Sequence, residues 1–232
     1  AIKGNLSYTG TAKRAVYIYT LFAFLALILL AVAFVTHDYR YVYVWQTSNN
    51  AMESKYLVSA IWGGMDGSML LWACFMALFS AICVCRVSIV PRDLFAWLVP
   101  LLSAATLFFI SLVLFYTNPF RIIPGGVLPT DGQGLNPVLQ NLSMLIHPPF
   151  LYLGFTGFVV PACFCLAALC SGNLSDVWTR LTRRWTLLAW MFLSAGIILG
   201  GHWAYVELGW GGFWAWDPVE NSSFLPWLTA TA

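Results

Sequence analysis

Long apolar runs without charged residues alternate with shorter polar segments along the whole chain. Five of these runs meet or approach the ~20 residues that a helix needs to cross the hydrocarbon core of a bilayer, namely 15–35, 68–85, 94–116, 150–170 and 185–201. A sixth apolar stretch begins at Phe224 and reaches the last residue, Ala232. The runs do not alternate with a period of two residues, which argues against a membrane β-barrel. The pattern predicts an all-α, polytopic membrane helical bundle with five complete transmembrane helices and the start of a sixth.

Composition supports this prediction and excludes several functions. The chain has 232 residues, of which 60% are hydrophobic and 9% charged, whereas soluble domains carry about 25% charged residues. A net charge of +2 without any basic run longer than two residues makes nucleic acid an unexpected partner. The predicted spans contain no Asp, Glu, Lys or Arg, which weakens an ion-coupled transporter interpretation. We expect residues 1–232 to form one transmembrane domain in contact with lipid.

The basic residues divide unequally between the two ends of the predicted bundle. Eight lie on the side of the N-terminus and three on the other side, in the segments 36–67, 117–149 and 202–223. Because short cytoplasmic loops are enriched in Lys and Arg, the N-terminal side is predicted to be cytoplasmic. The opposite, outer side carries all three histidines and most of the carboxylates: His37, His147, His202, Asp38, Glu53, Asp66, Asp131, Glu207, Asp217 and Glu220. Titratable chemistry is therefore expected on the outer face.

The six cysteines lie in apolar stretches and form no Cys-x-x-Cys or Cys-x-x-Cys-His motif. A thioredoxin-type thiol pair and covalent haem attachment to this chain are therefore not expected. Their predicted role is that of small buried hydrophobic residues.

The predicted outer loop 202–223 is unusually rich in tryptophan. Five of the twelve tryptophans fall in residues 202–227: Trp203, Trp210, Trp214, Trp216 and Trp227. An interfacial aromatic belt would explain any one of them, but it explains their concentration poorly. Gly209, Gly211 and Gly212 bracket Trp210, which would let the backbone approach a flat ligand, and in an extended segment Trp214 and Trp216 would point the same way. Asp217 and Pro218 suit the start of a helix. The segment predicts a cation-free aromatic surface for a large planar ligand.

His147 precedes two prolines at the outer end of the fourth predicted span. If Pro148 and Pro149 occupy the first helical turn, His147 lies at the helix entrance on the outer surface. A lone histidine there is more often a cap or a solvated residue, but beside the aromatic surface it is a candidate axial ligand to haem iron. His202 has two interpretations, a variant ligand or a hydrogen-bonded interfacial histidine.

At these residues the sequence resembles a known family. The string ELGWGGFWAWDPVENSSFLPWL is similar to the tryptophan-rich signature of the haem-handling proteins of cytochrome c maturation. HPPFLYLGF and AIWGGMDGSMLLW resemble further segments of the CcmF/NrfE-type haem lyase subunits. The family usually has His-Glu where this chain has Met65-Asp66. Family members are longer and have more spans, so the resemblance implies that this chain is a piece of a longer pattern, with a second outer histidine expected after Ala232.

The resemblance also implies a function. Such proteins take haem from a CcmE-type haem chaperone and join it to the thiols of apocytochrome c, which a CcmH-type subunit presents. Haem would be bound non-covalently, as a b-type group and as a substrate, on the periplasmic face of the bacterial inner membrane; a mitochondrial inner membrane is the alternative for a split form. The family's haem-binding positions correspond here to His147, as axial ligand to the iron, and to the motif residues Trp210, Gly211, Gly212, Trp214, Trp216, Asp217 and Pro218.

Two other functions stay open at this point. One is haem export or delivery of the CcmC type, without the ligation step, and the other is a b-haem or quinol redox subunit. As part of a haem lyase complex the chain would contribute to a cytochrome c synthetase, but no residue is assigned to the chemical step. Bond formation would draw on haem and thiol chemistry, with the protein supplying binding and orientation.

Overall fold

A computed structural model of the chain describes residues 6–86, 89–125, 128–209 and 211–232. Its five long helices are α1 (Leu6–Val35), α4 (Met65–Cys85), α5 (Arg92–Phe115), α6 (Leu142–Ser171) and α7 (Val177–Glu207). Each of them is long and apolar enough to cross a membrane. The short elements are α2 (Val42–Thr47), α3 (Ser54–Ala60), the 3-10 turn η2 (Pro137–Leu139) and α8 (Pro218–Thr231). Over the described residues the predicted all-α bundle with five membrane-spanning helices is confirmed.

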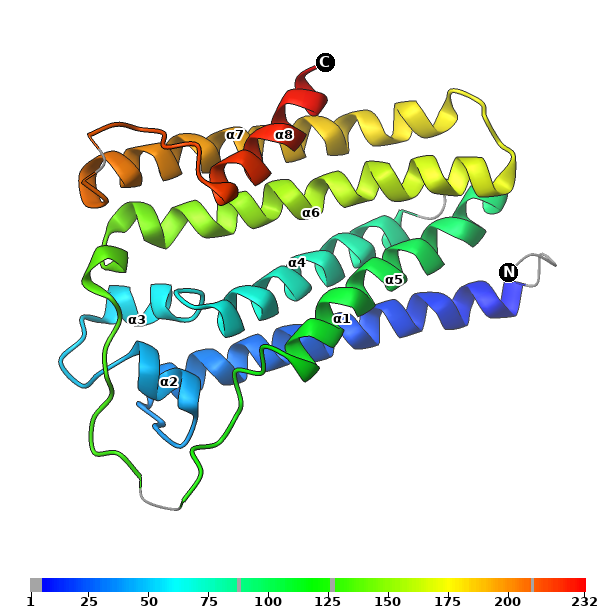
Figure 1. The fold of residues 1–232 in the computed structure, drawn as a ribbon. Helices are drawn as coiled ribbons and strands as arrows, with labels where there is room; N and C mark the ends of the chain where they lie inside the picture. The colour runs from blue at the N-terminus through cyan, green and yellow to red at the C-terminus, as the bar shows by residue number, and fades with distance from the viewer. Residues whose placement is uncertain (1–5, 87–88, 126–127, 210) are drawn as a thin grey trace.

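The long helices lie side by side and run back and forth between two ends of the bundle (Figure 1). One end carries α2, α3 and the connections α5–α6 and α7–α8; the other carries the N-terminus and the connections α4–α5 and α6–α7. The segments predicted to face outward therefore gather at one end, which we call the loop end. The N-terminal end is the basic end, with Lys13, Arg14, Arg86, Arg92, Arg180, Arg183 and Arg184 among the described residues.

Two clusters of buried side chains form the core, one toward each end. At the loop end, Phe34 and Leu30 of α1 pack with Tyr43 and Val44 of α2. Toward the basic end, residues of α4, α5 and α6 pack together, including Val84, Leu94, Leu98 and Phe164. The outward faces of the spans leave large apolar side chains such as Leu21 and Phe22 exposed, as lipid-facing surfaces require.

Helices α6 and α7 pack closely through small residues. A Cβ atom added at Gly154 would approach the Cβ of Leu193 to 2.7 Å, and one added at Gly157 would approach the Cβ of Ala189 to the same distance. Small side chains let helix backbones approach in this way inside a membrane, where packing replaces the hydrophobic effect between helices. This pairing determines the position of His147 relative to α7.

Several predicted spans begin too late. The fourth span begins at Leu142 rather than at 150, and the fifth begins at Val177 rather than at 185. The fourth helix was expected to begin at its prolines, but Pro148 and Pro149 lie inside it. The fifth helix begins in the arginine-containing segment 177–184, which the apolar run does not include. The helical start predicted at Pro218 is confirmed, with Asp217 as N-cap. Of the predicted loop 202–223, residues 202–207 belong to α7, which extends to Glu207, and residues 218–223 belong to α8, which begins at Pro218.

Candidate functional site

The expectation that His147 lies at a helix entrance on the outer surface is wrong. Asn141 caps α6 by accepting a hydrogen bond from the Ser143 backbone N–H at 2.7 Å, so the helix begins at Leu142 and His147 lies in its second turn. Pro148 and Pro149 are therefore inside the helix, where they remove two backbone N–H donors. The imidazole is half-buried between α6 and α7.

A backbone carbonyl of α7 determines the tautomer of His147. Its Nδ1 lies 2.7 Å from the carbonyl oxygen of Gly196, and because a carbonyl only accepts, Nδ1 must donate. In the neutral ring the lone pair then belongs to Nε2, the arrangement that metal-binding histidines use when their other nitrogen donates to a carbonyl. The ring also stacks on Trp203, with centroids 6.4 Å apart. Sequence reasoning missed both contacts, because each joins residues about fifty positions apart.

Gly200 leaves the space that the imidazole occupies. A Cβ atom at this position would come within 2.8 Å of His147 Nδ1 and 3.2 Å of Nε2. Gly196 and Gly200 lie four residues apart on α7. The Gly196 carbonyl accepts the hydrogen bond from the ring, and the missing side chain of Gly200 leaves room for the ring to pack against the helix. A small-residue repeat in a transmembrane helix is a recognisable sequence signal, and it could have indicated this contact.

Three side-chain hydrogen bonds join the loop-end terminus of α7 to the start of α6 and to η2. The Asn141 amide donates to Glu207 at 2.6 Å, Trp203 Nε1 donates to the Val138 carbonyl at 3.0 Å, and the Ser143 hydroxyl lies 3.0 Å from His202 Nδ1. The contact with Ser143 favours the interpretation of His202 as a hydrogen-bonded interfacial residue. Its role as a haem ligand stays a prediction.

The tryptophan-rich connection 208–217 turns sharply at its glycines. Gly209 and Gly211 have φ values of +67° and +74°, which glycine adopts without steric cost. No atom lies within 4 Å of a Cβ added at Gly211 or Gly212, so among the described residues these glycines bend the chain rather than admit a close neighbour. Trp210 lies outside the described residues, and its predicted role in the ligand surface stays a prediction.

Trp216 has a strained backbone. Its φ of +60° is unusual for a bulky residue, and it contradicts the extended segment that would aim Trp214 and Trp216 the same way. Their rings instead meet edge to face, with an interplanar angle of 85°. Left-handed backbone at a non-glycine residue persists where neighbouring contacts enforce it, and such residues concentrate at binding sites.

The start of α8 supplies the contacts that enforce this conformation. The Glu220 carboxylate accepts from the backbone N–H groups of Ala215 and Asp217, on both sides of Trp216. The Asn221 amide donates to the Trp216 carbonyl at 3.0 Å. Asp217 accepts from Glu220 N at 2.7 Å, which completes a capping box. The Pro-Val-Glu-Asn segment therefore fixes the position of Trp216, a role that the sequence motif alone did not reveal.

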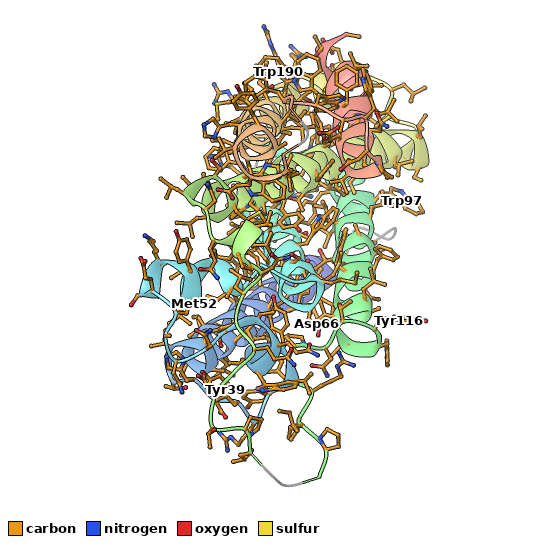
Figure 2. The ribbon with its side chains drawn as sticks, turned by 60° about the vertical axis from the view of Figure 1, so that its left-hand side comes forward. Tyr39, Met52, Asp66, Trp97, Tyr116 and Trp190 are labelled. Atoms are coloured by element: carbon orange, nitrogen blue, oxygen red, sulfur yellow. The ribbon has the colours of Figure 1, made fainter. Side chains whose placement is uncertain are left out.

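A continuous group of five aromatic rings, the aromatic cluster, extends from this connection along α8 to the middle of α7. Trp214 and Trp216 each meet Phe224, Phe224 stacks on Trp227, and Trp227 stacks on Trp190. Figure 2 shows Trp190 beside α8, far from Tyr39 and the connections around α2. Trp190 and Trp227 anchor their indole N–H groups on Thr231 and Ser194. Two of the four indole N–H groups in the cluster therefore have an acceptor within the protein.

Trp214 differs from these anchored tryptophans. Its Nε1 is buried, and no acceptor for it is found in the described part of the chain. It lines a small cavity of about 70 Å³ together with His147, Trp203, Asp217 and Glu220. A cavity of this size holds a few water molecules. No Lys or Arg occurs between Trp185 and Ala232, so the site combines a free imidazole lone pair, an unused indole donor and apolar rings without a basic side chain.

The fold and this site define a polytopic all-α membrane protein with a histidine beside a tryptophan-rich connection. A sequence model described as "Cytochrome C assembly protein" matches residues 62–232. The chain belongs to this family of cytochrome c assembly proteins, and the predicted resemblance to its CcmF/NrfE-type members is confirmed.

The similarity to individual members supports the same family assignment. The chain is 42% identical to the cytochrome c-type biogenesis protein CcmF of Haemophilus influenzae over 100% of its length and 36% of that protein. It is 44% identical to CcmF of Escherichia coli over 89% of the chain and 32% of that protein, and 41% identical to NrfE of H. influenzae over 99% of the chain and 36% of that protein. A solved structure of the cytochrome c haem lyase CcmF superimposes with a TM-score of 0.83 and 31% identity, covering 99% of this chain and 36% of that one. The chain thus spans about a third of the length of these relatives.

Proposed function

We propose that this chain takes part in cytochrome c maturation by binding haem as a substrate at its loop end and presenting it for covalent attachment to apocytochrome c. Within a haem lyase complex its contribution would be binding and orientation. The proposed partners are a CcmE-type haem chaperone as donor, and apocytochrome c with a CcmH-type thiol-presenting subunit as acceptor. The proposed location is the bacterial inner membrane, with the loop end in the periplasm; the eight-to-three division of basic residues supports this orientation.

The observation that carries the proposal is the hydrogen bond from His147 Nδ1 to the Gly196 carbonyl. It leaves the Nε2 lone pair for iron, and an axial histidine oriented by a second hydrogen bond is a common arrangement in haem proteins. Trp214 and Trp216 would cover the porphyrin face, while the unused Trp214 indole N–H offers a donor to a carboxylate of the substrate. The proposed state of the bound haem is b-type and non-covalent, and the lack of a Cys-x-x-Cys-His motif in residues 1–232 supports this part of the proposal.

Haem binding at His147 requires the tryptophan-rich connection to move. The present cavity of about 70 Å³ is too small for a porphyrin, so the part of the connection from Gly209 to Trp214 would swing away from α7 when haem enters. The left-handed Gly209 and Gly211, with open space around them, suit such a hinge. The capping box at Asp217 would then form the fixed end of the moving segment.

A ligand substitution in the complete protein tests the proposal. His147→Ala should abolish cytochrome c maturation and change the haem absorption spectrum of the purified protein, and added imidazole should restore part of both by filling the vacant coordination position. His37→Ala, which removes a loop-end histidine distant in sequence from the site, should leave maturation and spectrum unchanged. If His147→Ala has a normal haem spectrum and matures cytochrome c normally, His147 is not part of the mechanism. If only His202→Ala loses maturation and the normal haem spectrum, His202 is the ligand instead.

A further inference from the structure

A second, larger cavity lies at the basic end, remote from the candidate haem site. Its volume is about 500 Å³, within the range of pockets that hold small molecules. It opens between the end of α4, the second half of α6 and the first turns of α7. Nothing in the proposed function uses this space.

The wall of this cavity is apolar and its rim is basic. The apolar side chains come from all three helices, among them Phe79, Ile82, Phe164, Leu181, Trp185 and Leu188. Arg86 from the end of α4 and Arg180 and Arg184 from the start of α7 complete the lining. Such a division of apolar wall and basic rim matches an amphiphile with an anionic head.

Two of the three arginines are not neutralised by the protein. Arg180 pairs with Asp176 at 3.1 Å, and both side chains are more than 70% exposed, a pair worth little in water. For Arg86 and Arg184, no ion pair occurs within the described ranges. The other carboxylate near this end, Asp93, accepts from Asn173. The rim therefore presents two guanidinium groups whose planar forks suit the oxygens of a phosphate.

The position of the rim relative to the membrane indicates the source of the phosphate. All three arginines lie at the ends of transmembrane helices, where headgroups are found, and Trp185 beside them is the residue type typical of that depth. The cavity continues toward hydrocarbon depth along Leu188, which is half exposed on the outside of α7. Basic pockets between transmembrane helices on the cytoplasmic side bind anionic lipid headgroups.

We propose that this cavity is a binding site for an anionic phospholipid, with its phosphate on Arg86 and Arg184 and an acyl chain against Phe79 and Leu188. The site is independent of haem binding at the loop end. Its occupant would add to the direct contact between α4 and α7 that Phe79 and Trp185 make, with ring centroids 5.4 Å apart.

Lipid retention by the complete protein tests this proposal. The protein is purified, exchanged into bilayers of phosphatidylglycerol and phosphatidylcholine, and its retained lipids are measured by native mass spectrometry. The unmodified protein should retain phosphatidylglycerol preferentially. Arg86→Gln combined with Arg184→Gln should weaken that retention roughly thirtyfold, because each arginine near an anionic surface contributes roughly fivefold.

A matched control removes the same charge at the same end. Lys13→Gln combined with Arg14→Gln on α1 lies outside the cavity lining and should leave retention unchanged. Equal loss in this control, or unchanged retention in the arginine variant, would overturn the proposal. Displacement of the lipid by millimolar inorganic phosphate alone would also overturn it, since it would identify a site for a soluble anion. A photo-crosslinker at Leu188 should capture lipid, and capture of another protein segment would contradict the assignment.

Discussion

Two non-helical regions lie at the same end of the bundle and are held in different ways. The connections around α2 and α3, together with the α5–α6 connection, are fixed by hydrogen bonds between residues distant in sequence. The Asp131 carboxylate accepts from the Asn50 backbone at 2.8 Å, and the buried Tyr43 hydroxyl bridges to the carbonyls of Ala60 and Ile61. The tryptophan-rich connection 208–217 is held mainly from one side, by the capping box of α8 and by ring contacts.

The space around the glycines also differs between the two regions. A Cβ at Gly132 would collide with the Ser48 carbonyl oxygen and lie 2.8 Å from that of Trp45, whereas a Cβ at Gly212 meets nothing within 4 Å. The first region is closely packed around Gly132, and the second has open space around Gly212. Rigid packing suits a scaffold, and local freedom suits a segment that must admit a ligand. The difference supports the assignment of haem binding to the second region.

Exchanging glycine for alanine in each region is expected to have the largest effect. Gly132→Ala should lower the free energy of unfolding by about 1–3 kcal/mol, because the new methyl group meets two backbone oxygens that cannot move independently. Gly212→Ala should change it by less than about 0.5 kcal/mol. Thermal unfolding of the detergent-solubilised protein, followed by tryptophan fluorescence, measures both. Equal effects of the two substitutions would remove the distinction between the regions.

The buried hydroxyl of Tyr43 offers a second comparison. Tyr43→Phe should cost about 1–3 kcal/mol, because the hydroxyl also accepts from the Gly64 backbone N–H at 3.0 Å and its loss leaves that partly buried donor without its partner. Tyr205, which is 54% exposed and stacks on Phe213, is the matched residue beside the tryptophan-rich connection. Tyr205→Phe should leave stability within about 0.5 kcal/mol. Chemical denaturation of both variants tests the difference, and a larger loss for Tyr205→Phe would contradict it.

Substitutions of two glutamates at helix starts test whether the conformation of Trp216 matters for haem retention. Glu53, the N-cap of α3, makes no capping hydrogen bond with its side chain, whereas Glu220 binds the backbone on both sides of Trp216. Glu220→Ala should cost about 0.5–2 kcal/mol, the usual range for a lost cap, and should release Trp216 from its left-handed conformation. The same variant is expected to reduce haem retention, while Glu53→Ala should change neither property. Normal haem retention in Glu220→Ala would show that the position of Trp216 is not required.

The sequence was sufficient to predict the membrane-spanning helices because the bilayer imposes their length and apolar character. It also predicted the start of α8, since a cap such as Asp217 acts within three residues of its partner. The helix start at Leu142 was missed because His147 and two prolines interrupt the apolar sequence there, and the start at Val177 was missed because the first turns of α7 contain three arginines. The Gly196 carbonyl on His147, the conformation of Trp216 and the anchoring of Trp190 depend on how α6, α7 and α8 pack. Apart from the small-residue repeat of Gly196 and Gly200, no local pattern indicates that packing.

The smallest predicted effect concerns pH and the anchoring of the first region. The pKa of Asp131 lies below its ordinary value of 3.8, chiefly because the Asn50 and Gly132 backbone N–H groups donate to the carboxylate. A group whose pKa is depressed in the folded protein stabilises it above the ordinary pKa, and this contribution is lost as the pH falls through the folded pKa. The exchange rate of the Asn50 amide hydrogen, corrected for the intrinsic pH dependence, should therefore be constant near neutrality and increase below about pH 4.

Asp131→Asn should show the faster exchange already at pH 7, because a neutral amide is a weaker acceptor than a carboxylate. The backbone amide of Tyr116, which donates to the Leu112 carbonyl at 2.9 Å, serves as the internal reference, since no carboxylate takes part in that bond. Protection of Asn50 that is insensitive both to acid and to Asp131→Asn would mean that packing against Gly132, rather than the carboxylate, fixes this connection.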